Sequence, residues 1–182
     1  MGAIRQPKPV KLIVSILAGD PALLDEAEAL LRDAFGPVDY RSDLLPFDHT
    51  TYYEPEMGPG LKRRIVAFQR LVDPGDLAAI KRQTNAMEER WAVGGKRRVN
   101  LDPGYVSLAK LVLATTKNHG HRIYLGQGIY AEVTLQYRSG RFQPWPWTYP
   151  DYASEVYCRM FGEIRARYLE QLRALGALSG DV

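Results

Sequence analysis

The chain lacks the residues on which several common kinds of function depend. Its single cysteine, Cys158, cannot form an internal disulfide or a Cys-x-x-Cys site, which is typical of a protein from a reducing cytosol. No His-Glu-x-x-His zinc motif and no Gly-x-Ser-x-Gly nucleophile motif occurs. We therefore predict a cytoplasmic protein without a disulfide framework. No residue pattern identifies a catalytic residue, so the sequence does not decide whether the protein is an enzyme.

Nucleotide-binding signatures and long apolar runs are also missing. The only Gly-Lys pair, Gly95-Lys96, is followed by Arg97 where a phosphate loop needs Ser or Thr, so we expect no GTP hydrolysis by that mechanism. The Gly-x-Gly at 126–128 joins two predicted strands and opens no helix, which excludes a dinucleotide fingerprint. The apolar run at 12–18 is far shorter than the roughly 18 residues that a membrane span requires, so we predict no membrane partner.

What is present fits one globular domain over residues 1–182. Apolar residues make up 46% of the chain and charged residues 25%, the usual balance of a folded protein. The net charge of +3 is unevenly spread: residues 1–57 hold 5 Lys or Arg and 10 Asp or Glu, whereas residues 58–182 hold 19 and 11. The basic part suits a phosphate-bearing partner, and it equally suits the chain's own acidic part.

Apolar periodicity and capping residues predict an alternation of strands and helices in the first half of the chain. The predicted elements are a strand at 10–19, a helix at 20–36, strands at 38–47 and 61–72, a helix at 73–91 and a strand at 94–101. This order is that of the ferredoxin-like split βαβ motif, and an irregular sheet with another strand order is the alternative. We predict the α+β class, with helices packed on a mixed or antiparallel sheet.

The second half predicts a hairpin and a final helix. Asp102-Pro103-Gly104 is typical of a type II turn, which leaves Asp102 either as a turn residue or as a ligand-binding one. Residues 107–115 fit a short helix capped by Ser107, or a strand. The final helix is expected to begin near Asp151.

Face matching sets the register of the predicted hairpin at 122–137. A three-residue loop at 126–128 pairs Leu125 with Ile129 and Tyr124 with Tyr130. The same register places Arg122 opposite Glu132, so we predict an ion pair on one face of the sheet.

Three clusters are candidates for a binding site. The loop at 43–58 is acidic and aromatic, and its carboxylates suit a hard cation or a general base, although its spacing matches no defined metal loop. The segment at 117–122 holds Lys117, His121 and Arg122, whose side chains suit a phosphate or carboxylate, or serve as structural residues with Arg122 paired to Glu132. The segment at 144–152 is rich in tryptophan, tyrosine and proline, which suits a base-stacking platform, a cover for a sheet edge or a dimer interface.

Several strings together resemble a known family. They are TTYYEPEMG, RRVNLDPGY, KLVLATTK, HRIYLGQGIYAEVTL and WTYPDY, in this order along the chain. They are similar to an uncharacterised prokaryotic domain family of unknown function, some of whose members carry an automatic label as GTP-binding proteins. The resemblance implies no activity, cofactor or site residue.

We predict from these observations a cleft that binds an anionic, phosphorylated small molecule or a nucleotide, with the 43–58 loop lying over the 117–122 segment. The expected ligand-binding residues are Tyr53, Glu54, Glu56, Asp102, Lys117, His121, Arg122 and Glu132. Mg²⁺ is the one cofactor that these carboxylates suggest, held by Glu54, Glu56 or Asp102. The alternatives are an RNA-binding protein and an interaction module without a ligand, such as one that forms a homodimer.

Overall fold

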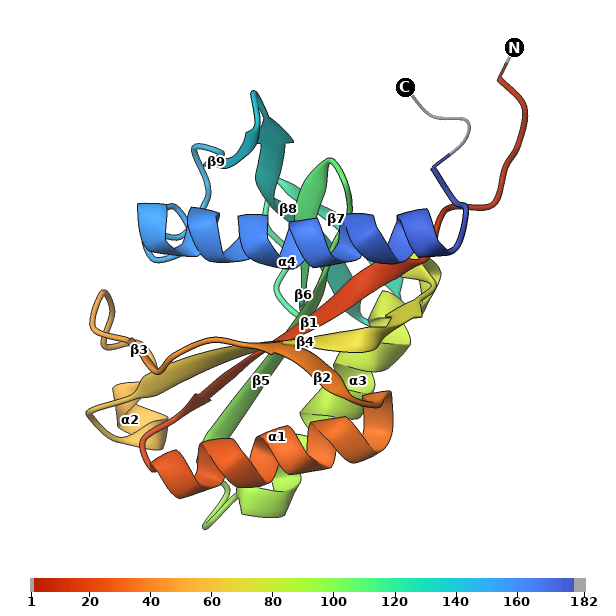
Figure 1. Ribbon diagram of the computed structural model, residues 1–182. Coiled ribbons are helices and arrows are strands. Elements are labelled where there is room, and N and C mark those ends of the chain that lie inside the picture. The colour runs from red at the N-terminus through yellow and green to blue at the C-terminus, as the bar shows by residue number, and fades with distance from the viewer. Residues whose placement is uncertain (1, 179–182) are drawn as a thin grey trace.

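The computed structural model describes residues 2–178, and Figure 1 shows them as one sheet with helices on both faces. The strands are β1 (Val10–Ala18), β2 (Val38–Arg41), β3 (Leu45–Pro46), β4 (Lys62–Val72), β5 (Val99–Val106), β6 (Lys110–Thr115), β7 (Arg122–Gly126), β8 (Ile129–Arg138) and β9 (Arg141–Pro144). The α-helices are α1 (Pro21–Phe35), α2 (Glu54–Met57), α3 (Leu77–Glu88) and α4 (Glu155–Ala174), and single 3₁₀ turns lie on either side of α3 at Pro74–Asp76 and Glu89–Trp91. Over residues 2–178, no helix has the length and apolar character to cross a bilayer.

The predicted ferredoxin-like start is confirmed. Strands β2, β4, β1 and β5 lie side by side in that order, and each neighbouring pair is antiparallel. Helix α1 joins β1 to β2 and α3 joins β4 to β5, so each helix connects two strands that are separated by a third. Asp20 caps α1 through a 2.9 Å bond from the Ala22 amide, as its sequence predicts. Apolar side chains of α1 pack with Leu12, Val14 and Ile16 of β1 into one core.

Helix α4 covers the opposite face of the sheet (Figure 1). It begins at Glu155, later than the predicted Asp151, because Ser154 is the residue whose hydroxyl accepts from the Tyr157 amide. Its buried side chains Phe161 and Ile164 pack with Ile13 and Ile65 of the sheet. Alternation along β1 and β4 therefore supplies two cores, one on each face.

The predicted turn at Asp102-Pro103-Gly104 is wrong, because all three residues lie inside β5. Pro103 lacks an amide hydrogen and cannot donate to a neighbouring strand. Its nitrogen points to the same side of β5 as the amide of Leu101, where no strand pairs with this part of β5, so no hydrogen bond between strands is lost. Gly104 is needed for close approach, since a Cβ there would lie 2.3 Å from the Val112 carbonyl oxygen. Tertiary pairing therefore outweighs the local turn preference.

Residues 110–115 form strand β6, so the strand alternative for 107–115 is confirmed and the helix alternative is wrong. In the hairpin, Arg122 pairs with Glu132 and Tyr124 with Tyr130, as face matching predicts. The predicted Leu125 pairing is wrong: Gly126 pairs with Ile129 and a bulge falls at Leu125. The turn is a two-residue one because Gln127 and Gly128 both adopt positive φ, which a primed hairpin turn requires.

The sheet divides between β5 and β6, and we call this division the fork. The two strands pair only from Gly104 to Val106, opposite Leu113 to Leu111, whereas β5 continues along β1 and β6 continues along β8. Helix α3 contacts β5, β6 and β8 and so lies beneath the fork. Two of its side chains replace the missing strand: Glu88 accepts from the Leu101 amide at 2.7 Å, and Lys81 donates to the Leu101 carbonyl at 3.1 Å.

A candidate binding cleft at the fork of the sheet

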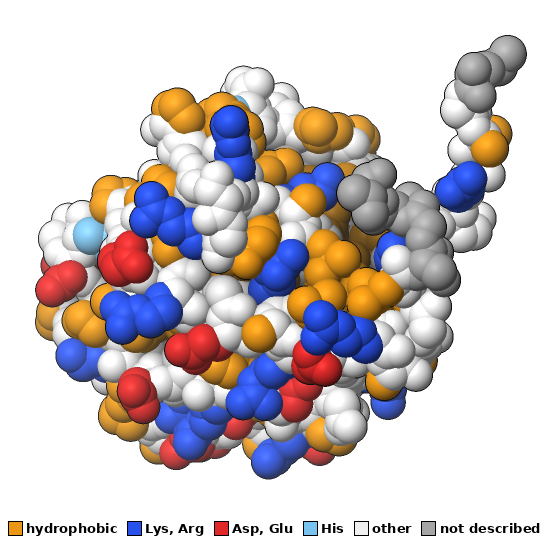
Figure 2. Space-filling view, turned by 45° about the horizontal axis from the view of Figure 1, so that its top comes forward, with side chains coloured by type: hydrophobic (Ala, Val, Ile, Leu, Met, Phe, Trp, Pro, Cys, Tyr) orange, Lys and Arg blue, Asp and Glu red, His pale blue; other side chains and the backbone are white. Residues whose placement is uncertain are grey.

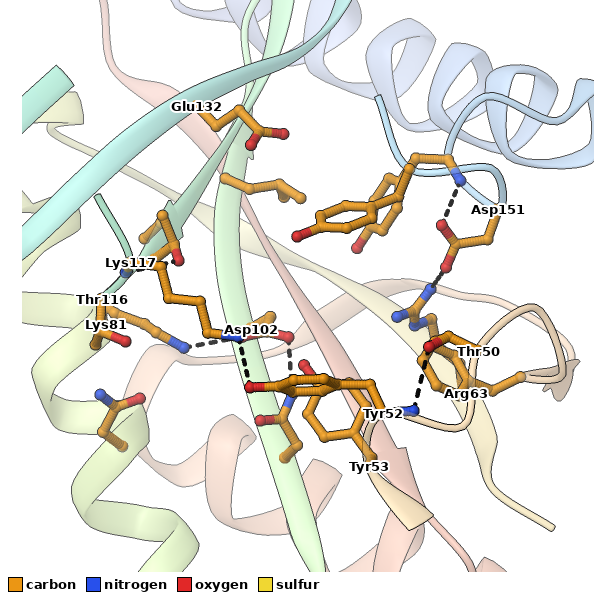
Figure 3. Close-up of a pocket in the computed structure, with 18 of the residues that line it drawn as sticks. Thr50, Tyr52, Tyr53, Arg63, Lys81, Asp102, Thr116, Lys117, Glu132 and Asp151 are labelled. Carbon is orange, nitrogen blue, oxygen red and sulfur yellow. Dashed lines mark hydrogen bonds and ion pairs between the residues drawn. The ribbon is translucent and has the colours of Figure 1, made fainter. Parts of the chain in front are cut away.

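The fork opens into a cleft of about 660 Å³ on the α4 side of the sheet. Its walls come from the loop at 47–53, Arg63 of β4, helix α3 with Glu89, Arg97 and strand β5, the end of β6 with residues 116 and 117, Arg122 of β7, Glu132 of β8 and the turn at 149–152. Figure 3 shows side chains from these segments converging on one space, with Asp102 at its centre. A cavity of this size suits a small molecule.

Lys81 and Asp102 form the floor of the cleft. The Lys81 ammonium, which is 5% exposed, donates to Asp102 Oδ1 at 2.9 Å, and Asn100 donates to Asp102 Oδ2 at 2.7 Å. Burial alone would raise the pKa of Asp102, but the charge and hydrogen bond of Lys81 outweigh it and hold this pKa below the ordinary value of 3.8. Asp102 is therefore an ionised acceptor at neutral pH.

Arg97 fixes the lower wall. Its guanidinium makes a bidentate ion pair with Glu56 of α2, at 2.7 and 2.8 Å, and donates to Asn100 at 2.7 Å. The hydrogen bonds from Arg97 lower the pKa of Glu56, while burial raises the pKa of the neighbouring Glu88. Arg97 thus fastens the acidic loop to the start of β5.

Lys117 lies at the mouth of the cleft, beneath Tyr52 of the acidic loop. Its ammonium lies 2.8 Å from the Tyr52 hydroxyl and 4.2 Å from the centre of that ring (Figure 3). The hydrogen bond from Lys117 lowers the pKa of the exposed Tyr52 phenol. No carboxylate of residues 2–178 lies in ion-pair contact with Lys117, which distinguishes it from the other cations of the cleft.

Glu132 organises the upper wall. It is 3% exposed and accepts from Arg122 and His121 at 2.9 Å each and from the Thr134 hydroxyl at 3.1 Å. Arg122 also donates to the Lys117 carbonyl at 3.0 Å, which positions the backbone at the mouth. The structural role considered for Arg122 is therefore confirmed, and its side chain lines the cleft as well.

Arg63 forms the far wall together with Asp151 (Figure 3). The two side chains are hydrogen-bonded and each is less than one-tenth exposed, and His49 Nε2 lies 3.5 Å from the same carboxylate. The Arg63 guanidinium lies 4.7 Å from the Phe47 ring centre and 5.3 Å from that of Tyr152. The pair ties the turn at 149–152 to β4.

The structure brings most of the predicted site residues together. Tyr53, Asp102, Lys117, Arg122 and Glu132 line the cleft, so the predicted approach of the acidic loop to the 117–122 segment is confirmed. His121 stands behind Glu132, Glu56 supports Arg97, and Glu54 is exposed without a side-chain partner among residues 2–178. Whether these residues bind a ligand stays a prediction.

Sequence reasoning missed Lys81, Arg63 and Asp151. A signal for Lys81 existed: it shares a helical stripe with the buried Leu77 and Thr84, so a charged residue occupies a core-facing position. Arg63 likewise falls on the same strand face as the buried Ile65, so a charged residue again occupies a core-facing position. No local pattern points to Asp151, whose place depends on the fold bringing residue 151 to β4.

The carboxylates of the cleft lie apart from one another and are paired with cations. Within residues 2–178 no three side chains of His, Cys, Asp or Glu come together in a group able to hold a metal ion. Asp102, Glu132 and Asp151 are each hydrogen-bonded to a cation instead. Mg²⁺ needs only one or two carboxylates beside the phosphate of a ligand, so the Mg²⁺ considered from the sequence stays a prediction.

The aromatic and proline-rich segment at 144–149 covers a sheet edge, one of the roles predicted for it. β7 and β9 both pair with β8 on the same edge, and the space between them is filled by Trp147 and Thr148, which donate to the carbonyls of Val133 and Thr134 at 2.9 and 2.6 Å. Its tryptophan rings stack on each other and Trp147 stacks on His121. On the face of the molecule that Figure 2 draws, Lys and Arg are interspersed with Asp and Glu.

Comparison with known proteins places the chain in a family without assigning it an activity. A search of curated proteins and a search of solved structures found no match. One family model, described as "Domain of unknown function (DUF4416)", matches residues 8–168, which include every strand and the lining of the cleft. The chain therefore belongs to this family of proteins of unknown function.

Proposed function

We propose that the cleft at the fork binds a small anionic molecule, with Lys117 as the group that contacts its phosphate or carboxylate. The observation that carries the proposal is the ammonium of Lys117, which lines a walled cleft and has no carboxylate partner among residues 2–178. A phosphate oxygen could replace the Tyr52 hydroxyl as its acceptor or share it.

The remaining cations of the cleft support this assignment by serving as rigid walls. Arg63, Arg97 and Arg122 are each held by a carboxylate, so they shape the site and keep its charges in place. Their fixed positions reduce the ordering that a ligand must impose on binding, which favours affinity.

The test is isothermal titration with inorganic phosphate and with adenosine monophosphate, comparing the wild type with Lys117→Ala. Loss of one charged hydrogen bond is worth about 1.5–3 kcal/mol, so the affinity should fall roughly tenfold to a hundredfold. Lys110→Ala is the matched control, since this exposed lysine lies at the opposite end of β6 and outside the cleft. Equal affinities of wild type and Lys117→Ala would contradict the proposal.

Arg122→Ala is not an equivalent test, although sequence reasoning treats the two cations alike. The side chain of Arg122 is 4% exposed and pairs with an equally buried Glu132. Its removal would leave Glu132 with a weakened set of partners, so we expect a loss of folding stability as well as of binding.

A further inference from the structure

The charges that line the cleft are evenly balanced. The cations are Arg63, Lys81, Arg97, Lys117 and Arg122, and the anions are Glu88, Glu89, Asp102, Glu132 and Asp151. Each cation except Lys117 is in ion-pair contact with a carboxylate. A ligand with several phosphates would meet one cation without a carboxylate partner and several acidic side chains, so the cleft suits a single anionic group.

The floor of the cleft offers acceptors for hydroxyl groups. Each oxygen of Asp102 accepts one hydrogen bond from the protein, and a carboxylate provides about four acceptor positions. Lys81 uses two of its three ammonium hydrogens, on Asp102 and on the Leu101 carbonyl. A hydroxyl placed here would donate to Asp102 and accept from Lys81.

Further polar groups of the lining have no hydrogen-bond partner among the side chains and backbone of residues 2–178. The Asn85 amide on α3 and the hydroxyls of Tyr53, Tyr152 and Thr116 lie in the cleft without a side-chain hydrogen bond to residues 2–178. The rings of Tyr52 and Tyr53 meet edge to face, with centres 5.0 Å apart. Neutral polar groups beside aromatic rings suit a body that carries hydroxyls on one side and C–H groups on the other.

From these contacts we infer that the ligand is the monophosphate of a polyhydroxylated body, held at its phosphate by Lys117 and at its hydroxyls by Asp102, Lys81 and Asn85. This inference rests on the proposed function and adds the class of ligand. Two sources share the chemistry, a free sugar phosphate and the ribose phosphate of a nucleoside monophosphate. Because the charges of its lining are balanced, the cleft should bind either of these monophosphates in preference to a nucleoside triphosphate.

The test compares inorganic phosphate, ribose phosphate, AMP and ATP by isothermal titration. Ribose phosphate or AMP should bind at least about tenfold more tightly than inorganic phosphate, and ATP no more tightly than AMP. If ribose phosphate and AMP bind equally, the sugar phosphate carries the recognition; a large gain for AMP identifies a nucleotide as the source. ATP binding about tenfold more tightly than AMP would overturn the inference.

Variants separate this inference from the proposed function. Asp102→Asn should remove most of the gain of ribose phosphate over inorganic phosphate, because it weakens the acceptor for the hydroxyl groups. Binding of inorganic phosphate should not be lost, since the substitution leaves Lys117 in place. Asn85→Ala keeps the test valid if Asp102→Asn fails to fold, because this half-buried side chain has no hydrogen-bond partner among residues 2–178; it should reduce the gain roughly threefold to tenfold. Binding of all four compounds with equal, Lys117-dependent affinity would refute the inference and leave the proposed function standing. If none of the four compounds binds, both the inference and the proposed function are refuted.

Discussion

Substitution of Gly104 by alanine tests whether the fork depends on close contact of two backbones. An alanine Cβ at this position would lie 2.3 Å from the Val112 carbonyl oxygen and 2.7 Å from Leu113 Cδ2, whereas ordinary contacts begin at 3.4 Å. The nearest obstacle is a backbone atom that no side-chain rotation can move, so β6 must shift by about 1 Å. Overpacking of this kind costs roughly 1–3 kcal/mol, and a backbone clash belongs at the upper end of that range.

Urea unfolding gives the measurement. With a slope of about 1–3 kcal/mol per molar, Gly104→Ala should lower the midpoint by roughly 1–2 M without changing the slope. Gly120→Ala is the matched control, because a Cβ there meets no atom within 4 Å and its φ is not positive. The control should be neutral, or stabilising by up to about 1 kcal/mol through the unfolded chain. A Gly104→Ala protein within about 0.5 kcal/mol of the wild type would refute the reasoning.

Two other substitutions test the buried charges. The pKa of Asp102 in the folded protein lies below its ordinary value of 3.8. Its ionised form therefore stabilises the fold fully above pH 3.8, and this stabilisation is lost as the pH falls through the folded pKa. The difference in free energy of unfolding between wild type and Asp102→Asn should thus be constant from about pH 5 to pH 8 and become smaller only in stronger acid. Urea unfolding of both proteins across this pH range is the measurement. A difference in free energy of unfolding that becomes smaller near neutral pH would contradict the lowered pKa of Asp102. Lys11→Met should lower the free energy of unfolding by roughly 2–4 kcal/mol, because the fully buried ammonium donates to Asp39, the Phe68 carbonyl and Gln171 at 2.6–2.9 Å. Exposed Lys62→Met is its control, and an equal, small effect of both would show that the Lys11 contacts contribute little.

The sequence predicted the elements whose signals are local and mutually consistent. Helix α1 combines an Asp20 cap, a proline at its first position and one apolar stripe, and the structure shows each of them. The Arg122–Glu132 pairing followed from strand alternation alone, since any shift by one residue would place polar side chains opposite apolar ones. Agreement between neighbouring signals made these predictions reliable.

The failures fall where distant parts of the chain decide the conformation. Asp102-Pro103-Gly104 has the residues of a turn, but β1 and β6 hold it extended. One prediction about distant segments was right: the acidic loop at 43–58 and the basic segment at 117–122 were expected to meet, and the contact of Lys117 with Tyr52 confirms that they do. The role of Lys81 was missed although its place on the apolar stripe of α3 signalled it. Asp151 could not be predicted, because only the folded chain brings it to Arg63 of β4.

The fork also bears on which strand edges the chain offers for pairing with other strands. A strand that loses its neighbour presents free amide and carbonyl groups, and such an edge is a template for β-aggregation. At Leu101 both groups are occupied by Glu88 and Lys81, and the next residue with the same orientation, Pro103, has no amide hydrogen to offer. The chain can therefore keep an opening in the middle of its sheet while presenting to other strands almost nothing to pair with.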